Sequence, residues 1–169
     1  MASIKGKTLF FTTSPRTPSK MIPEIALLAE EFSGMPWSLE TQEAFMNALY
    51  ESPFFESQNK PKNPAFSARD RITRSPKALG FVDLKPVISL TEAGSRLISC
   101  KRTEEVFLRQ LLKFQLPSPY HTTSKDGVMF YVRPYLEILR LINSLEKVSF
   151  DELMIFGMQL TDYHKFDEI

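Results

Sequence analysis

Residues 79–99 contain the feature that most limits how this chain folds. Two short apolar runs, residues 81–82 and 87–89, flank the loop sequence DLKP, and the sequence TEAG follows at residues 91–94. Apolar runs on either side of a proline-containing loop predict a β-hairpin. A threonine followed by an acidic first turn predicts the start of a helix. The segment therefore predicts a strand, a tight loop, a strand and a helix in direct succession.

Two helices and a strand are expected well before this hairpin. Residues 8–13 (TLFFTT) are rich in strand-forming residues. A helix is predicted from Pro23 to the residue before Gly34, because apolar residues recur there every three or four positions. A second helix is predicted after Ser38, whose hydroxyl is a good helix cap, and it should end at residues 52–53.

A third, basic helix is expected directly before the hairpin. The pattern Ser67-x-x-Asp70 resembles a capping box, which predicts a helix that begins near Ala68. An interior proline disrupts a helix, so Pro76 predicts either a kink or a new helix capped by Ser75. A helical projection separates an apolar face from a polar one; the polar face holds Asp70, Thr73, Arg74 and Lys77.

The predicted order of elements gives the fold class. Helix, helix, basic helix, strand, tight loop, strand and helix is the order of a winged helix-turn-helix. We therefore expect a mainly α (α+β) protein in which residues 1–103 form a winged-helix subdomain with a small β-wing.

A second helical module is expected in residues 104–169. Amphipathic patterns cover residues 104–114 and 134–145, and in the latter the apolar positions are Leu136, Leu139 and Ile142. Ser149-x-x-Glu152 is a capping box that predicts a third helix. The module is expected to be the truncated start of a second winged-helix-like subdomain.

Charge is distributed unevenly along the chain although the net charge is only +1. Residues 60–85 contain seven basic and two acidic residues, whereas residues 20–56 contain one basic and seven acidic residues. A net charge near zero predicts no general attraction to nucleic acid, so any affinity for DNA must come from the local basic segment.

Composition excludes several other classes of protein. No window approaches the roughly 18 consecutive apolar residues of a membrane span, and the N-terminus lacks the regions of a signal peptide. Cys100 is the single cysteine, so no internal disulfide is expected. These features predict a cytoplasmic protein without a membrane partner.

No catalytic or metal site is expected within this chain. Asp70 together with Asp83-x-Lys85 formally matches the acid and lysine pattern of metal-dependent nucleases, but about one acid-x-lysine triplet is expected by chance at this composition. His121 and His164 are too far apart in sequence for a zinc-ligand pattern. We therefore predict no catalytic residue and no metal ligand.

Several short sequence segments together resemble one enzyme family. The segments are SPRTPSKMIPE, QEAF, AFSARDR, GFV, ISLTEAG and VFLRQLLKFQLPSPYH, in this order. The combination resembles the N-terminal DNA-recognition region of AlwI-type type II restriction endonucleases, which include type IIS and nicking enzymes. The resemblance implies winged-helix recognition subdomains followed by a separate metal-dependent nuclease domain.

That resemblance implies a function for the chain as a whole. It would be the sequence-specific recognition domain of a type II restriction endonuclease, bound to double-stranded DNA at a short asymmetric site. The cutting would belong to a C-terminal nuclease domain or subunit absent from this chain. No cofactor is expected for this chain, and Mg²⁺ is expected for the nuclease domain.

The residue chemistry nominates specific DNA contacts. Arginine donates two hydrogen bonds to a guanine edge, whereas loop lysines mainly neutralise phosphates. Asp70 is either an acceptor for cytosine or a helix cap. Aromatic residues at helical spacing, Trp37, Phe45, Phe66 and Phe81, are expected in the core. The candidate DNA-binding residues are Arg16, Lys60, Lys62, Ser67, Arg69, Asp70, Arg71, Thr73, Arg74, Lys77 and Lys85.

Two other functions fit the same order of elements. Winged-helix transcriptional regulators share it, but they usually dimerise on palindromes, so binding to an asymmetric site separates the two hypotheses. A protein-interaction module with a winged fold would bind no duplex, even at low salt.

Overall fold

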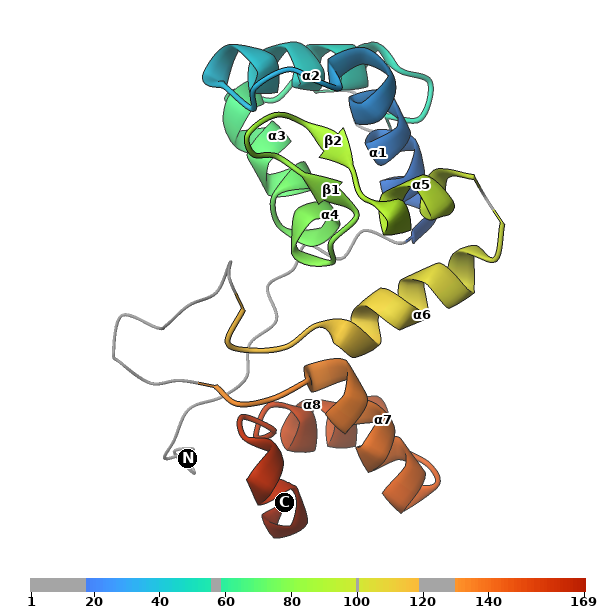
Figure 1. The fold of residues 1–169 in the computed structure, drawn as a ribbon. Helices are drawn as coiled ribbons and strands as arrows, with labels where there is room; N and C mark the ends of the chain where they lie inside the picture. Colours follow the sequence, from blue (N-terminus) through green and yellow to red (C-terminus); the bar gives the residue numbers. More distant parts are fainter. Residues whose placement is uncertain (1–17, 56–58, 100, 119–129) are drawn as a thin grey trace. The chain divides into compact units, whose positions relative to one another are not determined.

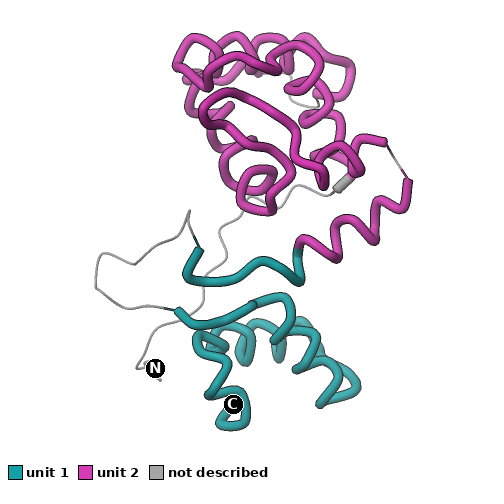
Figure 2. The backbone as a smooth tube through the Cα atoms, in the orientation of Figure 1, with its two compact units in different colours: residues 1–11, 111–169 teal, residues 12–110 magenta. Residues whose placement is uncertain are grey.

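The computed structural model describes residues 18–55, 59–99, 101–118 and 130–169 (Figure 1). The chain divides into two compact units, one spanning residues 12–110 and the other containing residues 111–169 (Figure 2). The strand expected at residues 8–13 and the candidate Arg16 lie outside the described residues, as do Cys100 and His121.

Helix α1 (Pro18–Phe32) opens the first unit and begins earlier than the sequence predicted. Pro23 lies inside the helix rather than at its start. A proline in the second turn removes one backbone hydrogen bond, and the buried apolar side that carries Ile25 and Leu28 favours the helix across this position. Gly34, with φ of 81°, follows the helix and turns the chain.

Helix α2 (Leu39–Glu51) confirms the prediction of a second helix. The Ser38 hydroxyl caps it by accepting a hydrogen bond from the Thr41 N–H at 3.2 Å, and the helix ends at Ser52. Its inner side buries Phe45 and Leu49 completely.

Helix α3 (Pro64–Ile72) begins one turn before the predicted position. The Asn63 side chain accepts a hydrogen bond from the Phe66 N–H at 2.9 Å, and Pro64 is the first helical residue. Asparagine followed by proline supplies both a cap and a preset first residue. The predicted start near Ala68 is therefore wrong, and Asp70 is not a cap.

Helix α4 (Ser75–Ala78) resolves the alternatives left open by Pro76. The chain forms a new helix, with Pro76 in its first turn, where the missing N–H costs no helical hydrogen bond. Ser75 lies within this helix, and the residue at the cap position is Arg74.

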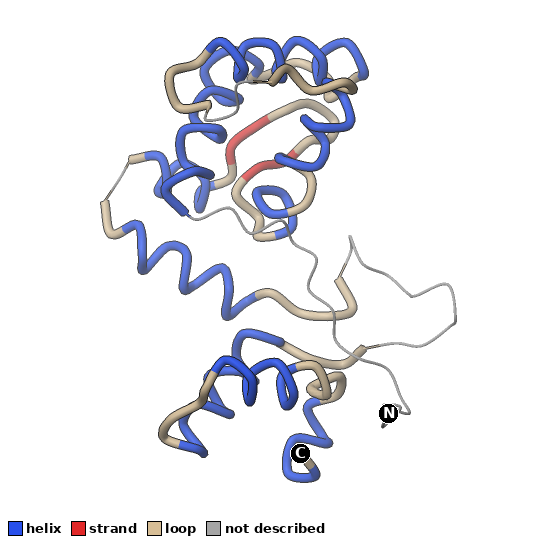
Figure 3. The backbone as a smooth tube through the Cα atoms, turned by 180° about the vertical axis from the view of Figure 1, so that it is seen from behind, coloured by secondary structure: helices blue, strands red, loops and turns tan. Residues whose placement is uncertain are grey.

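The predicted hairpin is present as strands β1 (Val82–Asp83) and β2 (Ser89–Leu90), which pair antiparallel (Figure 3). The chain between α1 and α2 is bonded to this hairpin. The Gly34 N–H donates to the Ile88 carbonyl at 2.9 Å, and the Ile88 N–H donates to the Met35 carbonyl at 2.8 Å. The hairpin is thus fixed to the turn after α1.

Helix α5 (Glu92–Ile98) confirms the helix predicted after the hairpin. The Thr91 hydroxyl donates to the Gly80 carbonyl at 2.6 Å and accepts from the Gly94 N–H at 3.0 Å. The Thr91 side chain therefore caps α5 and bonds it to the backbone at Gly80. A Cβ at Gly94 would lie 2.0 Å from the Phe81 carbonyl oxygen, so the helix approaches this backbone more closely than any other residue type allows.

The core of the first unit lies between α1, α2, α3, the hairpin and α5. Helix α3 packs mainly against α2, and α1 packs against α5 and α2. Helix α6 (Thr103–Lys113) adds Phe107, whose ring meets the Phe81 ring edge-on at a centroid distance of 5.0 Å. The division between the two units falls inside α6, whereas the sequence placed its boundary before residue 104.

The second unit contains helices α7 (Pro134–Leu145) and α8 (Phe150–Gly157) and the 3-10 helix η1 (Tyr163–Glu168). The predicted capping box is present between Ser149 and Glu152. The apolar stripe of α7 remains partly exposed, whereas Glu137 and Leu141 are buried. The described residues are mainly helical, which confirms the coarse fold class.

The close contact at Gly94 predicts a large effect on stability. Gly94→Ala would push its methyl group into the Phe81 carbonyl, so we expect the free energy of unfolding to fall by about 2–3 kcal/mol in urea denaturation. Gly157→Ala is the control, because its Cβ would have no neighbour closer than 3.9 Å. Equal stability of the two variants would contradict the close packing of α5 on the hairpin.

The capping box of α8 predicts a measurable pKa change. Hydrogen bonds from the hydroxyl and then from the N–H of Ser149, at 2.7 and 2.8 Å, lower the pKa of Glu152. Because the folded pKa is lowered, this stabilisation is present above the ordinary glutamate pKa of about 4.3 and is lost as the pH falls through the folded value.

We expect Ser149→Ala to raise the pKa of Glu152 toward that ordinary value in an NMR titration, because the stronger of the two donors is removed. Ser95→Ala, which removes a hydroxyl that donates to the Thr91 carbonyl, should leave the pKa of Glu152 unchanged. An unchanged pKa in Ser149→Ala would argue against the capping box.

Candidate nucleic-acid interface

Helix α3 and the residues around it form the candidate interface. Ala65, Ala68 and Ile72 are buried, and they fix the side of α3 that faces the core. With 3.6 residues per turn, the opposite side carries Asp70 and Ser67, whereas the exposed Arg69 and the half-buried Thr73 lie between the two sides. The predicted apolar face is confirmed for Ala65, Ala68 and Ile72. Of the predicted polar face only Asp70 lies on α3, because Thr73, Arg74 and Lys77 follow the end of this helix.

Arg74 and Asp70 form an ion pair on this exposed side. The Arg74 Nε lies 2.7 Å from the Asp70 Oδ1, and the Arg74 side chain is 47% exposed. An exposed pair four residues apart contributes at most about 1 kcal/mol to stability. The main effect of Asp70 is therefore to orient the guanidinium of Arg74 at the end of α3.

Arg69 lies exposed one turn before Thr73, on the same side. Its guanidinium carbon is 5.9 Å from the centroid of the Phe66 ring. The Thr73 hydroxyl donates its hydrogen bond to the Arg69 carbonyl at the end of the helix. Ser67 is half-buried in the first turns of α3.

Phe66 differs from the other aromatic residues that the sequence assigned to the core. Phe45 and Phe81 are fully buried and Trp37 packs against the core, as predicted, but Phe66 is 55% exposed. The prediction failed because it placed the helix start too late, so the orientation of the first turn was not fixed. Only the Asn63-Pro64 cap could have signalled that Phe66 faces outward.

The Arg71 side chain is mostly buried and is bonded within the unit rather than exposed to solvent. Its side chain is 16% exposed and forms an ion pair with Glu24, which is 5% exposed. The guanidinium carbon also lies 4.9 Å from the centre of the Phe55 ring. Both contacts are within the unit, so Arg71 is better suited to holding α3 against α1 than to binding a ligand.

The remaining candidate cations lie on either side of α3 in the sequence. Lys60 and Lys62 are exposed in the segment before α3, with the Lys60 ammonium 6.0 Å from the centroid of the Tyr50 ring. Lys77 is half-buried in α4, and Lys85 is exposed in the loop between β1 and β2. The loop is anchored because Leu84 is buried.

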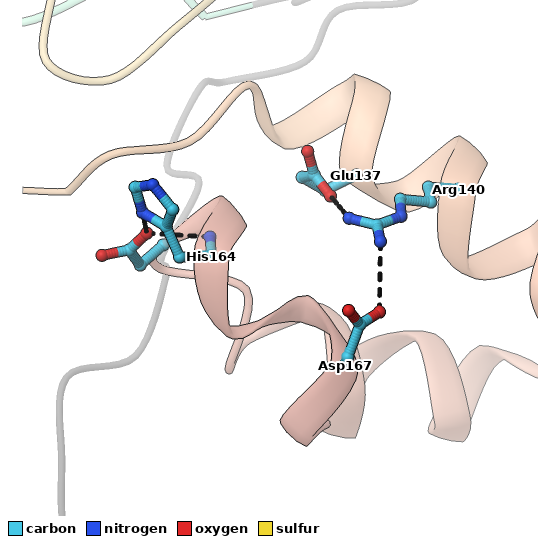
Figure 4. A network of polar contacts seen from close by, with 5 residues as sticks. Glu137, Arg140, His164 and Asp167 are labelled. Carbon is cyan, nitrogen blue, oxygen red and sulfur yellow. Dashed lines mark hydrogen bonds and ion pairs between the residues drawn. The ribbon is translucent and has the colours of Figure 1, made fainter.

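The second unit contains a separate polar network (Figure 4). Arg140 approaches Glu137 at 3.6 Å and Asp167 at 3.1 Å, and so links α7 to η1. The Asp162 carboxylate accepts from the His164 backbone N–H at 3.0 Å, which lowers the pKa of Asp162. These contacts hold the C-terminal turn of the unit in place.

A pocket of about 390 Å³ lies beside this network. Its wall is mainly apolar, with the buried Glu137 as its carboxylate; the lining residues are Gln115, Leu116, Pro117, Tyr131, Val132, Arg133, Leu136, Glu137 and Tyr163. In the described ranges, no group of three or more histidine, cysteine or acidic residues is placed to hold a metal ion. No helix in these ranges is both long and apolar enough to cross a membrane.

Comparison with known protein families decides the class of the protein. The sequence model of the AlwI restriction endonuclease family matches residues 77–169, which is more than half of the chain. The chain belongs to the AlwI restriction endonuclease family. No curated protein matches it.

Membership of the AlwI family makes DNA the partner of this protein and favours a restriction enzyme over the transcriptional regulator. The matched region begins in α4 and includes the hairpin, α5, α6 and the second unit. Helix α3 lies before it. The DNA contacts nominated on α3 therefore depend on the geometry of that helix and not on the family match.

The two arginine pairs predict losses of stability of different size. Arg71→Ala would leave Glu24 with a buried charge, so we expect the free energy of unfolding to fall by about 3 kcal/mol or more. Arg74→Ala removes only an exposed partner and should cost less than about 1 kcal/mol. Urea denaturation measures both, and a larger loss in Arg74→Ala would contradict the assignment of Arg71 as the structural arginine.

Proposed function

We propose that the unit spanning residues 12–110 is the sequence-specific DNA-recognition module of a type II restriction endonuclease. Helix α3 enters the major groove of a DNA duplex and reads base edges. Family membership supports the class of enzyme, and the geometry of α3 supports the recognition role.

The order of elements supports a winged-helix architecture for this module. Helices α1, α2 and α3 precede a short antiparallel hairpin, and α5 follows it. The hydrogen bonds between Ile88 and the turn at Gly34 hold the hairpin against the helices as a small wing. On this proposal, α3 is the recognition helix, because it is the third helix of the unit and only the short helix α4 separates it from the wing. Residues 111–169 are the start of a second helical module.

One observation carries the proposal. Helix α3 buries Ala65, Ala68 and Ile72 and leaves Arg69 exposed, and Arg74, just past the end of the helix, is exposed as well. A major groove accepts an α-helix, and arginine forms two hydrogen bonds with the N7 and O6 atoms of guanine. Asp70 presents Arg74 to the groove in the way that a supporting carboxylate presents a binding arginine.

The lysines around α3 have a different part in the proposal. Lys60, Lys62 and Lys85 are exposed outside the helix, where a phosphate backbone would pass. Contacts of lysine with phosphates set affinity and salt dependence and carry no sequence information. Ser67 lies within α3, and Thr73 and Lys77 follow it; these three residues complete the proposed surface, from which Arg71 is left out.

Cleavage belongs to another part of the enzyme on this proposal. A separate nuclease domain or subunit, with Mg²⁺ as its cofactor, would cut near the short asymmetric site that α3 reads. The module itself would position that nuclease on the duplex.

Selection of binding sites from randomised duplex DNA, at moderate salt and without added metal, tests the function. Enrichment of one short asymmetric sequence is the expected result. Enrichment of a palindrome bound by a dimer would favour a transcriptional regulator. Failure to bind any duplex at low salt would overturn the proposal in favour of a protein-interaction module.

Replacement of one arginine tests the recognition surface. Arg74→Ala should weaken binding to the selected site by roughly 1–3 kcal/mol, because two hydrogen bonds to a base edge are lost. Arg96→Ala is the matched control, since Arg96 forms an exposed pair with Glu92 four residues away on α5, at 2.6 Å. Titration of labelled duplex measures both, and unchanged affinity in Arg74→Ala would remove Arg74 from the surface.

A further inference from the structure

An exposed phenylalanine stands within the polar face of α3. Phe66 is the third residue of the helix, and its N–H is fixed by the Asn63 cap at 2.9 Å. At about 100° per residue, its side chain projects within about 40° of Asp70 and Thr73, and far from the buried Ala68. Phe66 is 55% exposed. The ring therefore contributes little to the core, and its position coincides with the surface proposed to read DNA.

The neighbours of Phe66 are the proposed reading groups. The Arg69 guanidinium lies 5.9 Å from its ring centroid, so an apolar plane and a hydrogen-bond donor stand side by side on one turn. In known recognition helices the N-terminal residues are those that approach base edges. The first turn of α3 presents Phe66 in that position.

The chemistry of the major groove offers one apolar group to such a ring. Each pyrimidine exposes its C5 position there, and thymine carries a methyl group at this position, which an apolar side chain contacts. A phenylalanine ring has no donor for the other base edges. The ring therefore discriminates by the presence of the methyl group alone.

We propose that Phe66 is a specificity-determining residue that contacts the C5-methyl group of a pyrimidine, next to the base that Arg69 reads. The inference rests on the proposed function of α3. Thymine and 5-methylcytosine both carry this group, so the same contact serves either base. Phe66 adds to the recognition surface a residue that the charge pattern of the sequence does not reveal.

Removal or addition of a single C5-methyl group in the DNA tests this contact, with the full chain as the binding protein. In the selected duplex each thymine is replaced in turn by deoxyuridine, which lacks only the methyl group, and each cytosine by 5-methylcytosine. At one position the methylated base should bind about three- to fivefold more tightly, which corresponds to burial of one methyl group. A sensitive thymine identifies thymine as the source, and a sensitive cytosine identifies 5-methylcytosine.

Phe66→Ala should lose this difference between methylated and unmethylated duplexes while keeping its unfolding temperature. Phe54→Ala is the matched control, because Phe54 is also exposed in the same unit, at 38%, but lies outside α3. It should keep the methyl preference of the unchanged protein.

Two results would overturn the inference, and they are distinguishable. If the protein selects a sequence but Phe66→Ala retains the full methyl preference, or no position shows one, the role of Phe66 is wrong while the proposed function stands. If the unchanged protein selects no sequence, the proposed function fails and the inference fails with it.

Discussion

The buried ion pair between Arg71 and Glu24 determines which side of α3 reaches solvent. It joins two helices that are distant in sequence, and both side chains are largely withdrawn from water. An uncompensated charge in that position is costly, so the pair resists rotation of α3 about its axis. The small residues Ala65 and Ala68 permit close packing against α2 and reinforce the same orientation.

The orientation of α3 in turn gives the exposed residues their grouping. Arg71 is taken to Glu24 and Phe55, whereas Arg69 and the pair of Arg74 with Asp70 remain accessible to solvent. One of the four charged residues between positions 69 and 74 is thus used for the fold, and the other three are more exposed. The same basic segment supplies both structural and surface charges, and only the helix geometry distinguishes them.

Local signals predicted much of the fold. Ser38, Thr91 and the Ser149–Glu152 box are side chains that bond to their own backbone, so their effect does not depend on the rest of the chain. The hairpin was predictable for a similar reason, because a short loop between apolar runs leaves few pairings. The start of α3 was not, since Asn63-Pro64 and Ser67-x-x-Asp70 are competing signals a turn apart.

Features that depend on packing between distant parts of the chain could not be predicted from local sequence patterns. The periodicity of α7 correctly predicted a helix but not which side is buried, and Glu137 is buried while Leu136 remains partly exposed. The candidate interface was predicted as a group of basic residues on one helix. The withdrawal of Arg71 and the exposure of Phe66 depend on α1 and on the true helix start, neither of which the charge pattern contains.

The pairing of Arg74 with Asp70 affects how the proposed surface would distinguish its site from unrelated DNA. A cation already paired at 2.7 Å gains little by exchanging its carboxylate for an ordinary phosphate. General affinity for the phosphate backbone is left to Lys60, Lys62 and Lys85, which the proposed function places beside it. On the proposed function, Arg74 would therefore add little to binding on an unrelated duplex and would strengthen it only where a base edge takes the place of Asp70, so its contribution goes to discrimination rather than to general affinity.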